Sequence, residues 1–481
     1  MEERGDTVEL SRGRDLSGLQ RLLYAAGNFG VAFSPTVVAA WLGFFYYGRE
    51  GPGGEPIVYV SAGAFGLIWF GCNAVNGLTD PVVGYLSDRT RSRWGRRKPW
   101  VVAGAPLLAL SFFFLWTPVT EGPSAANALV LAAALFFFWF FFTVVVAPYL
   151  SLLPEITPYD DERVRVSAYM AIFEVLGTIG GNLLPPLFAA LLAGGLWFLP
   201  DSYQFMALLA GLLLVWFFVQ AVAAVRERYA PASDRAGSAW KGLLRALAEF
   251  GSTFRNRPFV PYVIGVGFYR MAISTVVFIA PFVATRVLAA YPVSDVDRSL
   301  LDALGAVADD GQVNWELAAG YLMMLVLVGA ALFFPLVSWL AARWGKRRLF
   351  VIALAAFGAV CCLMAGLGEL PAISPVVQAL ALFLLAAFPV SIALVVMRPL
   401  LADVIDADEK LTGKRREGVY NGMEGLIMKV AAGLGPLLAG ALFVAFGKST
   451  AHNLGVRLCG PLAGVCLLAA AAAFTRYPIR K

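Results

Sequence analysis

Residues 73 to 98 place a carboxylate inside an apolar helix and then end that helix in a strongly basic turn. An ionised side chain in such a helix is costly when the helix crosses a bilayer, so it normally faces a cavity or a partner and marks a functional site. Asn73, Asn76 and Asp80 are three and four residues apart and share one helical face. One carboxylate beside amide and hydroxyl oxygens suits Na⁺, and the carboxylate alone can carry H⁺. The pattern predicts a cation-coupling site at Asp80.

A second ionisable residue, Lys429, lies in the apolar segment 418–446. Buried charges need a partner. The nearest acid in the sequence, Glu424, is five residues away and about 140° round the helix, so the partner should come from another helix. We expect Lys429 to lie near Asp80, with snorkelling of the lysine to the membrane interface as the alternative.

Glu174 and Arg270 each lie about a dozen residues inside a predicted helix, which is near the middle of a bilayer. They could line a solute cavity or pair with each other. Arg270 would suit an anionic group of a solute. The residues expected to line the cavity are Asn73, Asn28, Tyr149, Glu174, Arg270 and Glu424.

The composition is that of a polytopic membrane protein. Of the 481 residues, 59% are hydrophobic and 15% charged, whereas soluble domains have about half and a quarter. The mean hydropathy is +0.72. Because a membrane helix needs about 20 apolar residues, the sequence predicts an all-α membrane protein with twelve transmembrane helices. Their approximate spans are 20–47, 58–87, 98–117, 125–153, 162–195, 203–225, 259–286, 314–342, 348–368, 374–403, 418–446 and 456–475.

Lys and Arg runs follow the second, sixth, eighth and tenth predicted helices, and acids dominate the loops on the other side. This is the positive-inside pattern, so the pI of about 9.0 requires no nucleic-acid partner. Both termini are expected to be cytoplasmic, in a multi-pass protein of the cell (inner) membrane. The expected parts are a cytoplasmic N-terminal segment (1–19), a six-helix half (20–225), a cytoplasmic central loop (226–258), a second six-helix half (259–475) and a cytoplasmic C-terminus (476–481).

A short repeat supports the division into halves. The second predicted helix ends in Ser-Arg-Trp-Gly-Arg-Arg-Lys (92–98), and the eighth ends in Ala-Arg-Trp-Gly-Lys-Arg-Arg (342–348). A shared motif at the second helix of each half predicts two duplicated halves with a solute site between them. The alternative is that any cytoplasmic turn of a membrane protein is basic.

Two long motifs carry a family resemblance. Residues 80–100, with Asp80-Pro81-x-x-Gly84 and the basic turn that follows, and residues 402–418 resemble the glycoside-pentoside-hexuronide:cation symporters of the major facilitator superfamily, typified by the melibiose carrier. The resemblance covers essentially the whole chain. It implies the major facilitator fold, with two six-helix halves and alternating access to a site between them.

The resemblance also implies roles for the residues around Asp80. Asp80 matches the second of two cation-binding aspartates, and Asn76 stands where the first would be. Thr79 matches an asparagine of the same site, Thr143 matches a threonine of the fourth helix, and the matching lysine, Lys429, lies beside the cation site. One of the two carboxylates is thus absent. This weakens the electrostatic attraction for Na⁺ and favours proton coupling.

The resemblance does not extend to the sugar-gripping residues. Where the melibiose carrier has two aspartates and an aromatic residue, this chain has Ala32, Val146 and Leu150. Residues 168–178 instead resemble a helix of animal sodium-dependent lysolipid carriers in the same superfamily branch. A less polar solute is therefore an alternative to a glycoside.

The basic turns can also act as a cytoplasmic latch between helices, because cations complement helix C-termini and pair with nearby acids. Plain topology signalling is the alternative, and both can hold. The latch candidates are Asp88, Arg89, Arg93, Arg96, Arg343, Arg347, Asp403 and Asp406.

Together these features predict a secondary active transporter that couples H⁺ or Na⁺ to uptake of a small solute. A sugar or glycoside is the leading solute class, with a lysolipid or other amphiphile as the first alternative. A non-transporting membrane sensor or scaffold is the second, which the buried Asp80 and Lys429 disfavour. We expect no enzymatic activity, no cofactor, no metal beyond a possible Na⁺ at Asp80, and a monomer in the lipid bilayer.

Overall fold

The computed structural model describes residues 16–51, 55–90, 92–157, 159–191, 201–227, 251–308, 311–413 and 416–478. These residues form helices, and their two isolated β-bridges lie in loops. The long helices of the first half are α1 (Gly18–Tyr47), α2 (Ala62–Arg89), α3 (Lys98–Phe114), α4 (Ala125–Ile156), α5 (Asp160–Leu191) and α6 (Ser202–Ala223). Those of the second half are α8 (Phe259–Phe282), α10 (Trp315–Trp344), α11 (Lys346–Leu363), α12 (Pro375–Thr412), α13 (Glu417–Phe446) and α14 (Leu454–Thr475). A short helix, α9 (Asp295–Ala303), lies between α8 and α10.

Each predicted transmembrane segment corresponds to one long helix, but some ends differ. The tenth segment was predicted to stop at residue 403, whereas α12 continues to Thr412 and ends at Gly413 with a left-handed φ of 66°. Charged residues in this extension keep helical geometry beyond the apolar run. The second segment begins four residues later than predicted, because the Ser61 side chain accepts a hydrogen bond from the Ala64 amide and caps α2. The predicted central loop and termini fall largely outside the described residues.

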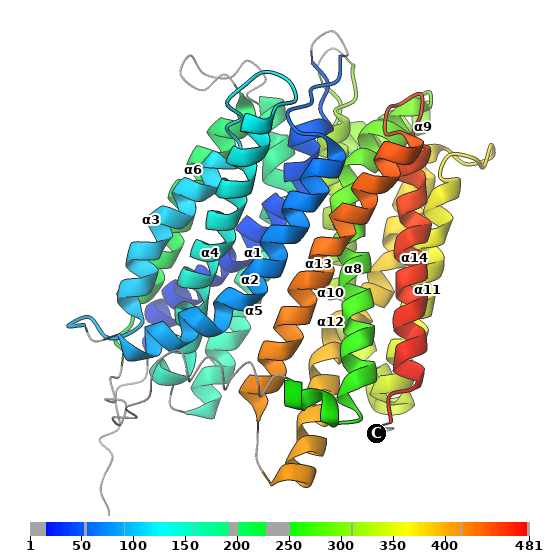
Figure 1. The fold of residues 1–481 in the computed structure, drawn as a ribbon. Coiled ribbons are helices and arrows are strands. Elements are labelled where there is room, and N and C mark those ends of the chain that lie inside the picture. Colours follow the sequence, from blue (N-terminus) through cyan, green and yellow to red (C-terminus); the bar gives the residue numbers. More distant parts are fainter. Residues whose placement is uncertain are drawn as a thin grey trace, which may run out of the picture.

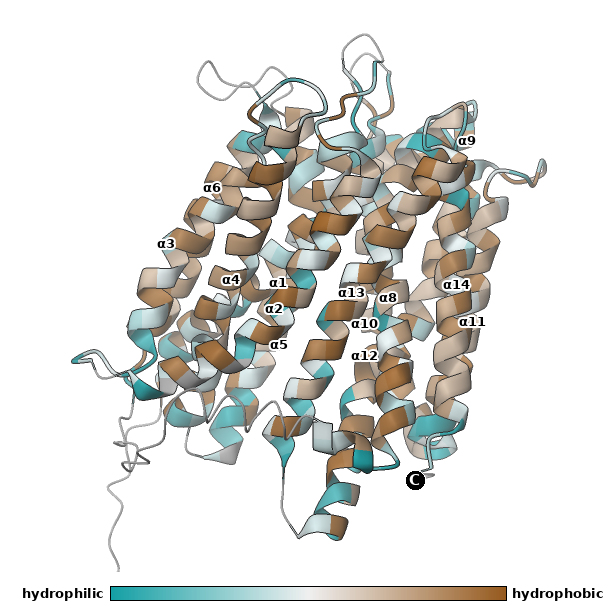
Figure 2. Ribbon diagram, viewed as in Figure 1, coloured by the Kyte–Doolittle hydropathy of each residue, from teal (hydrophilic) through white to brown (hydrophobic). Residues whose placement is uncertain are grey.

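Hydropathy follows the bundle axis, with apolar residues concentrated along the middle of the helices and polar residues at the ends and loops (Figure 2). Ten helices of the described chain are long and apolar enough to cross a membrane. The other two long helices are α3, with 17 residues, and α2, with 28. Because α2 carries Asn73, Asn76 and Asp80, its low hydropathy is a consequence of the polar site that it positions.

The two halves repeat one packing scheme. In the first half α1 packs against α5 and α6, and α3 packs against α4 and α6. In the second half α8 packs in the same way against α13 and α14, and α11 against α12 and α14. Between the halves α2 packs against α13, α5 against α10, and α1 against α8, and the α2–α13 contact is visible at the centre of Figure 1.

We call the end of the bundle where α2 ends and the C-terminus lies the basic end, which is at the bottom of Figure 1. Aromatic side chains of both halves close the opposite end. Tyr47 of α1 stacks on Phe282 of α8 with ring centroids 5.6 Å apart, and its ring centroid lies 6.4 Å from that of Phe443 of α13. Phe65 of α2 lies 6.0 Å from Phe278 of α8. All five side chains are buried. Such pairs each contribute about 0.5–1.5 kcal/mol beyond area burial, so they hold the halves together here.

Two cations of the second half cap the end of α1. Arg286, in the π-helical turn after α8, donates to the Gly48 carbonyl and to the Glu50 carboxylate. Lys448, in the loop after α13, donates to the Tyr47 carbonyl, and its Nζ lies 4.4 Å from the centroid of the Tyr47 ring. The last carbonyls of a helix carry partial negative charge and favour cations. These contacts add a polar link to the aromatic closure.

This closure should depend on pH through Lys448. Burial, and then the charge of Arg286, lowers the pKa of Lys448 from 10.5 to about 8. In the open form Lys448 lies in water and binds its proton more tightly than in the closed form. Loss of this proton as the pH rises through about 8 therefore favours the closed form. We expect spin labels at Glu121 and Ser449 to show a larger closed fraction at pH 9.5 than at pH 7. Lys448→Met should remove this dependence, and a wild-type closed fraction that falls or stays constant would contradict it.

Candidate cation site and solute cavity

Asp80 and Lys429 form an ion pair that joins the two halves. Lys429 Nζ, on α13, lies 2.7 Å from both carboxylate oxygens of Asp80, on α2. The inter-helix partner predicted for Lys429 is therefore present. The side chains of Asp80 and Lys429 are 45% and 26% exposed, respectively, so the pair borders open space instead of being sealed in an apolar core.

Side-chain oxygens from two helices surround this pair. The Thr143 hydroxyl, on α4, lies 2.9 Å from Asp80 Oδ1 and 3.1 Å from Asn76 Oδ1, and its one proton can serve only one of them at a time. Asn76 Oδ1 lies 3.3 Å from Lys429 Nζ. The Thr79 hydroxyl donates to the Asn76 carbonyl at 2.8 Å. The structure thus brings all five residues of the predicted cation site together.

Glycines let α2 and α13 approach closely enough for this pair to form. A Cβ at Gly77 of α2 would lie 2.5 Å from a methyl carbon of Leu426, and one at Gly433 of α13 would lie 3.1 Å from the Cα of Phe70. The absence of side chains at these two positions brings the helix backbones together one to two turns from the ion pair. The helix contact thereby positions the charges.

The chemistry available at this site is that of a single carboxylate. Within the described ranges, no cluster of three or more His, Cys, Asp or Glu residues could hold a metal ion. Asp80 Oδ1, Asn76 Oδ1 and Thr143 Oγ1 supply three oxygens within hydrogen-bonding distance of a neighbour in the set. This donor set fits a hard monovalent cation such as Na⁺, and Asp80 alone fits a proton.

Two of the predicted cavity residues have accessible side chains. Glu174, on α5, is exposed, and its Oε2 accepts a hydrogen bond of 3.3 Å from Asn28 of α1. Asn28 is buried and also donates to the Met170 carbonyl at 3.0 Å. Arg270, halfway along α8, is exposed. Glu174 and Arg270 do not pair with each other, and no ion pair to Arg270 occurs in the part of the chain that the structure describes.

Two other predicted cavity residues are enclosed in helix interfaces. Asn73 is buried and donates to the Trp69 carbonyl of its own helix at 3.0 Å. Tyr149 is also fully buried. Its hydroxyl donates to the Tyr24 carbonyl at 2.8 Å, and the Tyr24 hydroxyl donates to the Tyr149 carbonyl at 2.7 Å. This reciprocal pair ties α1 to α4, so in this conformation Tyr149 and Asn73 are not open to a solute.

Glu424 is part of a cluster that contains a residue our sequence analysis missed. Glu424 is buried and accepts a hydrogen bond from the Tyr262 hydroxyl of α8. Its other oxygen lies 3.4 Å from Nη1 of Arg398, on α12. Arg398 lies inside the predicted segment 374–403, and the charge rule that singled out Asp80 and Lys429 could have found it.

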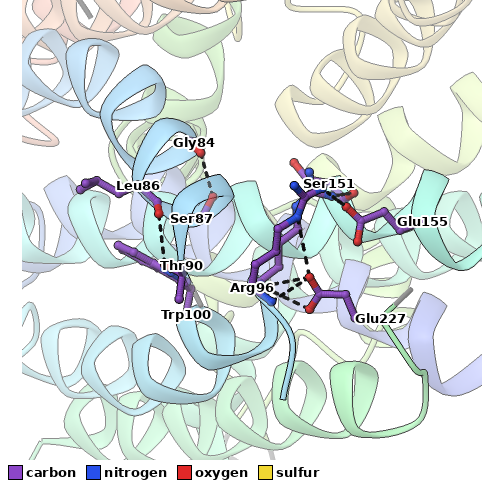
Figure 3. Close-up of polar contacts among 10 residues, drawn as sticks. Gly84, Leu86, Ser87, Thr90, Arg96, Trp100, Ser151, Glu155 and Glu227 are labelled. Carbon is purple, nitrogen blue, oxygen red and sulfur yellow. Dashed lines mark hydrogen bonds and ion pairs between the residues drawn. The ribbon is translucent and has the colours of Figure 1, made fainter. Parts of the chain in front are cut away.

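The basic turn between α2 and α3 is tied to its own half (Figure 3). Arg96 bonds the Glu155 carboxylate at the end of α4, and Arg97 lies 2.9 Å from the same carboxylate. The Arg96 amide donates to Glu227, after α6, at 2.9 Å. On the other side of the turn the Trp100 indole donates to the Thr90 hydroxyl at 2.7 Å. These contacts hold the ends of α2, α4 and α6 together.

The equivalent turn of the second half makes the same kind of contact. Lys346 lies 2.6 Å from Asp403 of α12, and Arg347 donates to the Phe474 carbonyl at 3.1 Å, which caps α14. Arg93 and Arg343 lie over the rings of Trp94 and Trp339, respectively. Arg89 is exposed at the end of α2, Asp406 lies on α12, and the side chain of Asp88 lies outside the described residues. The latch candidates thus include residues that bond within each half in this conformation.

Known structures share this architecture. A crystal structure of the nucleoside transporter NupG matches with a TM-score of 0.62 at 13% identity, covering 96% of this chain and 99% of that one. The chain therefore has the fold of two six-helix halves found in known transporters, with an ion pair between the halves.

Within that class, the chain belongs to the family of MFS/sugar transport proteins, whose model matches residues 23–294 and 313–481. An uncharacterized symporter of Synechocystis sp. is 27% identical and covers 89% of this chain and 85% of its own length. The isoprimeverose transporter of Lactiplantibacillus pentosus is 24% identical over 90% of this chain and 81% of its own. The sphingosine-1-phosphate transporter of Mus musculus is 23% identical over 73% of this chain and 66% of its own.

Proposed function

We propose that this transporter is a cation-coupled symporter of a sugar or glycoside, in which Asp80 carries the coupled H⁺ or Na⁺. The observation that supports this most is the Asp80–Lys429 pair, with Nζ 2.7 Å from both carboxylate oxygens and the Asn76 and Thr143 oxygens beside it. This ion pair crosses the interface between two halves that move relative to each other. Cation binding there can therefore change the relative stability of the inward-open and outward-open conformations.

Lys429 acts as the counter-ion of Asp80 when no transported cation is bound. A proton on Asp80 would remove the attraction to Lys429, and Na⁺ would compete with Nζ for the oxygens of Asp80, Asn76 and Thr143. Either event weakens the tie between α2 and α13. Because only one carboxylate is present, proton coupling is the leading choice and weaker Na⁺ binding the second.

The solute would reach this site from the basic end, since aromatic contacts close the opposite end. The positive-inside rule assigns the basic end to the cytoplasm, together with both termini. The described conformation is then the inward-open one. In the outward-open one the basic turns would meet, and residues such as Arg93, Arg343 and Asp406 would latch the halves. The predicted division of the chain and its cell-membrane location belong to this proposal.

The isoprimeverose transporter supports a glycoside as the solute. The sphingosine-1-phosphate transporter supports the alternative, a lysolipid or other amphiphile. We propose a monomer, because both halves of the site lie within one chain.

Reconstituted vesicles test the coupling. We expect a pH gradient to drive uptake of a neutral glycoside such as isoprimeverose, with a weaker response or none to a Na⁺ gradient at constant pH. A Na⁺ response alone would assign the ion to Na⁺. If neither gradient changed the uptake of any glycoside or lysolipid tested, symport would be refuted.

A further inference from the structure

The guanidinium of Arg398 is held in place by a buried carboxylate and presented to open space. The Arg398 side chain is 73% exposed, whereas that of Glu424 is 4% exposed. One Glu424 oxygen faces Arg398 Nη1, and the other accepts from the Tyr262 hydroxyl. Glu424 is therefore fixed from two helices, α8 and α12. In the described chain Arg398 has no other hydrogen-bond or ion-pair partner, so its Nε and Nη2 donors are available.

The cluster lies on the side of the second half that faces the first. α12 packs against α10 and α11, while α13 packs against α8 and against α2 of the first half. Arg398 of α12 and Tyr262 of α8 both contact Glu424 of α13, so the cluster joins α12 to the helices α8 and α13, which contact α1 and α2 of the first half. Arg398 is five residues, about 7.5 Å along α12, from Asp403 at the basic end.

The charges around this cluster connect it to the cation site. Glu424 and Lys429 are five residues apart on α13, which is about 7.5 Å along the helix. In the described state two positive charges, Arg398 and Lys429, balance two negative ones, Glu424 and Asp80. A cation on Asp80 adds one positive charge, which at about 10 Å and an effective dielectric of about 20 favours a nearby anion by roughly tenfold.

We infer that Arg398 binds an anionic group of the transported solute, a carboxylate or a phosphate, with Glu424 and Tyr262 as positioning residues. A guanidinium whose Nε–Nη2 edge is available can bind either group with two parallel hydrogen bonds. The cation on Asp80 strengthens this binding and the anion strengthens cation binding, because coupling between two sites is reciprocal. The inference rests on the proposed function and narrows its solute class to acidic glycosides or phosphate-bearing amphiphiles.

Matched solute pairs test the inference on the purified full chain in nanodiscs. One pair is para-nitrophenyl glucuronide and para-nitrophenyl glucoside, which differ by one carboxylate. The other is lysophosphatidic acid and monoacylglycerol, which differ by one phosphate. We expect the anionic member of one pair to bind at least about tenfold more tightly than its neutral partner. The pair that shows the preference identifies the source of the anionic group.

Variants then assign the preference to Arg398. Arg398→Gln should abolish it without changing the affinity for the neutral solute, and Arg398→Lys should restore it in part. Glu424→Gln should weaken binding of the anionic solute alone. If Glu424 had a merely structural role, this variant would weaken binding of both solutes of the pair. Arg476→Gln, an exposed arginine at the end of α14, is the control. The inference would be overturned if, in both pairs, the two members bound equally or neither bound. It would also be overturned if the preference for the anionic member survived in Arg398→Gln. Gradient-driven uptake of a neutral glycoside would still stand in that case, so the two failures are distinguishable.

Discussion

Asp80→Asn should abolish cation-driven accumulation while leaving solute exchange across the membrane intact. A driving force of 100 mV on one charge is worth about 2.3 kcal/mol, or roughly 50-fold accumulation. The amide cannot carry a proton and lacks the charge that holds Na⁺, so the accumulation ratio should fall to about one. The measurement is uptake of a glycoside into vesicles under an imposed gradient, beside counterflow exchange without one.

Asp302→Asn, in the short helix α9 outside the long helices, is the matched control and should behave as wild type. Lys429→Met complements the test, because it leaves the Asp80 carboxylate without its counter-ion. The unpaired carboxylate is costly in a membrane helix, so gradient-driven uptake should fall in this variant as well. Gradient-driven accumulation that persists in Asp80→Asn at the wild-type level would place the coupling elsewhere.

Gly66→Leu should drive the halves apart at the opposite end of the bundle. A Cβ at Gly66 of α2 would lie 2.8 Å from the Cα of Leu437 of α13, and a backbone atom cannot move aside as a flexible side chain can. Overpacking of this kind costs about 1 to 3 kcal/mol, which corresponds to roughly a 5- to 150-fold change in the ratio of closed to open molecules. The distance between spin labels at Glu121 and Ser449 should increase accordingly.

Gly63 provides a control one turn away on the same helix. A Cβ at Gly63 meets no atom within 4 Å, so Gly63→Leu should leave the label distance unchanged. If both variants shifted the distance equally, or if neither did, the close approach of α2 and α13 would not be what sets the closed state.

The fold was predictable because the bilayer permits few solutions. A lipid-facing chain must satisfy its backbone hydrogen bonds within helices, so long apolar runs identify the helices and the basic loops mark their ends. The main error in the helix ends was α12, which runs nine residues beyond the predicted boundary to Thr412. Charged residues there were assigned to a loop, although they remain helical outside the apolar run.

The ion pair was also predictable, because an unpaired charge inside a membrane helix is costly, and this applies to both residues. Asp80 and Lys429 each need a partner, and no suitable residue is close on their own helices. The depth of the other candidates did not predict their exposure. Tyr149 and Asn73 lie at plausible depths, but the Tyr149 hydroxyl is used in the packing of α1 and α4 and Asn73 faces α13.

Features that depend on contacts between the halves had no local signal. Phe282 and Phe443 resemble any other apolar residues of a membrane helix, and only their arrangement around Tyr47 shows that they close one end. The role of Gly66 likewise follows from Leu437, more than 370 residues later in the sequence. Arg398 could have been noticed as a charge, but its orientation depends on Glu424 and Tyr262 from two other helices.

The central claim is that the cation moves through Asp80, and solute-driven cation flux tests it most directly. A glycoside gradient imposed on wild-type vesicles without any initial cation gradient should carry H⁺, or Na⁺ if that is the ion, into the lumen. In Asp80→Asn vesicles the glycoside should still enter, but no cation should accompany it. Cation flux of equal size in both would contradict the account.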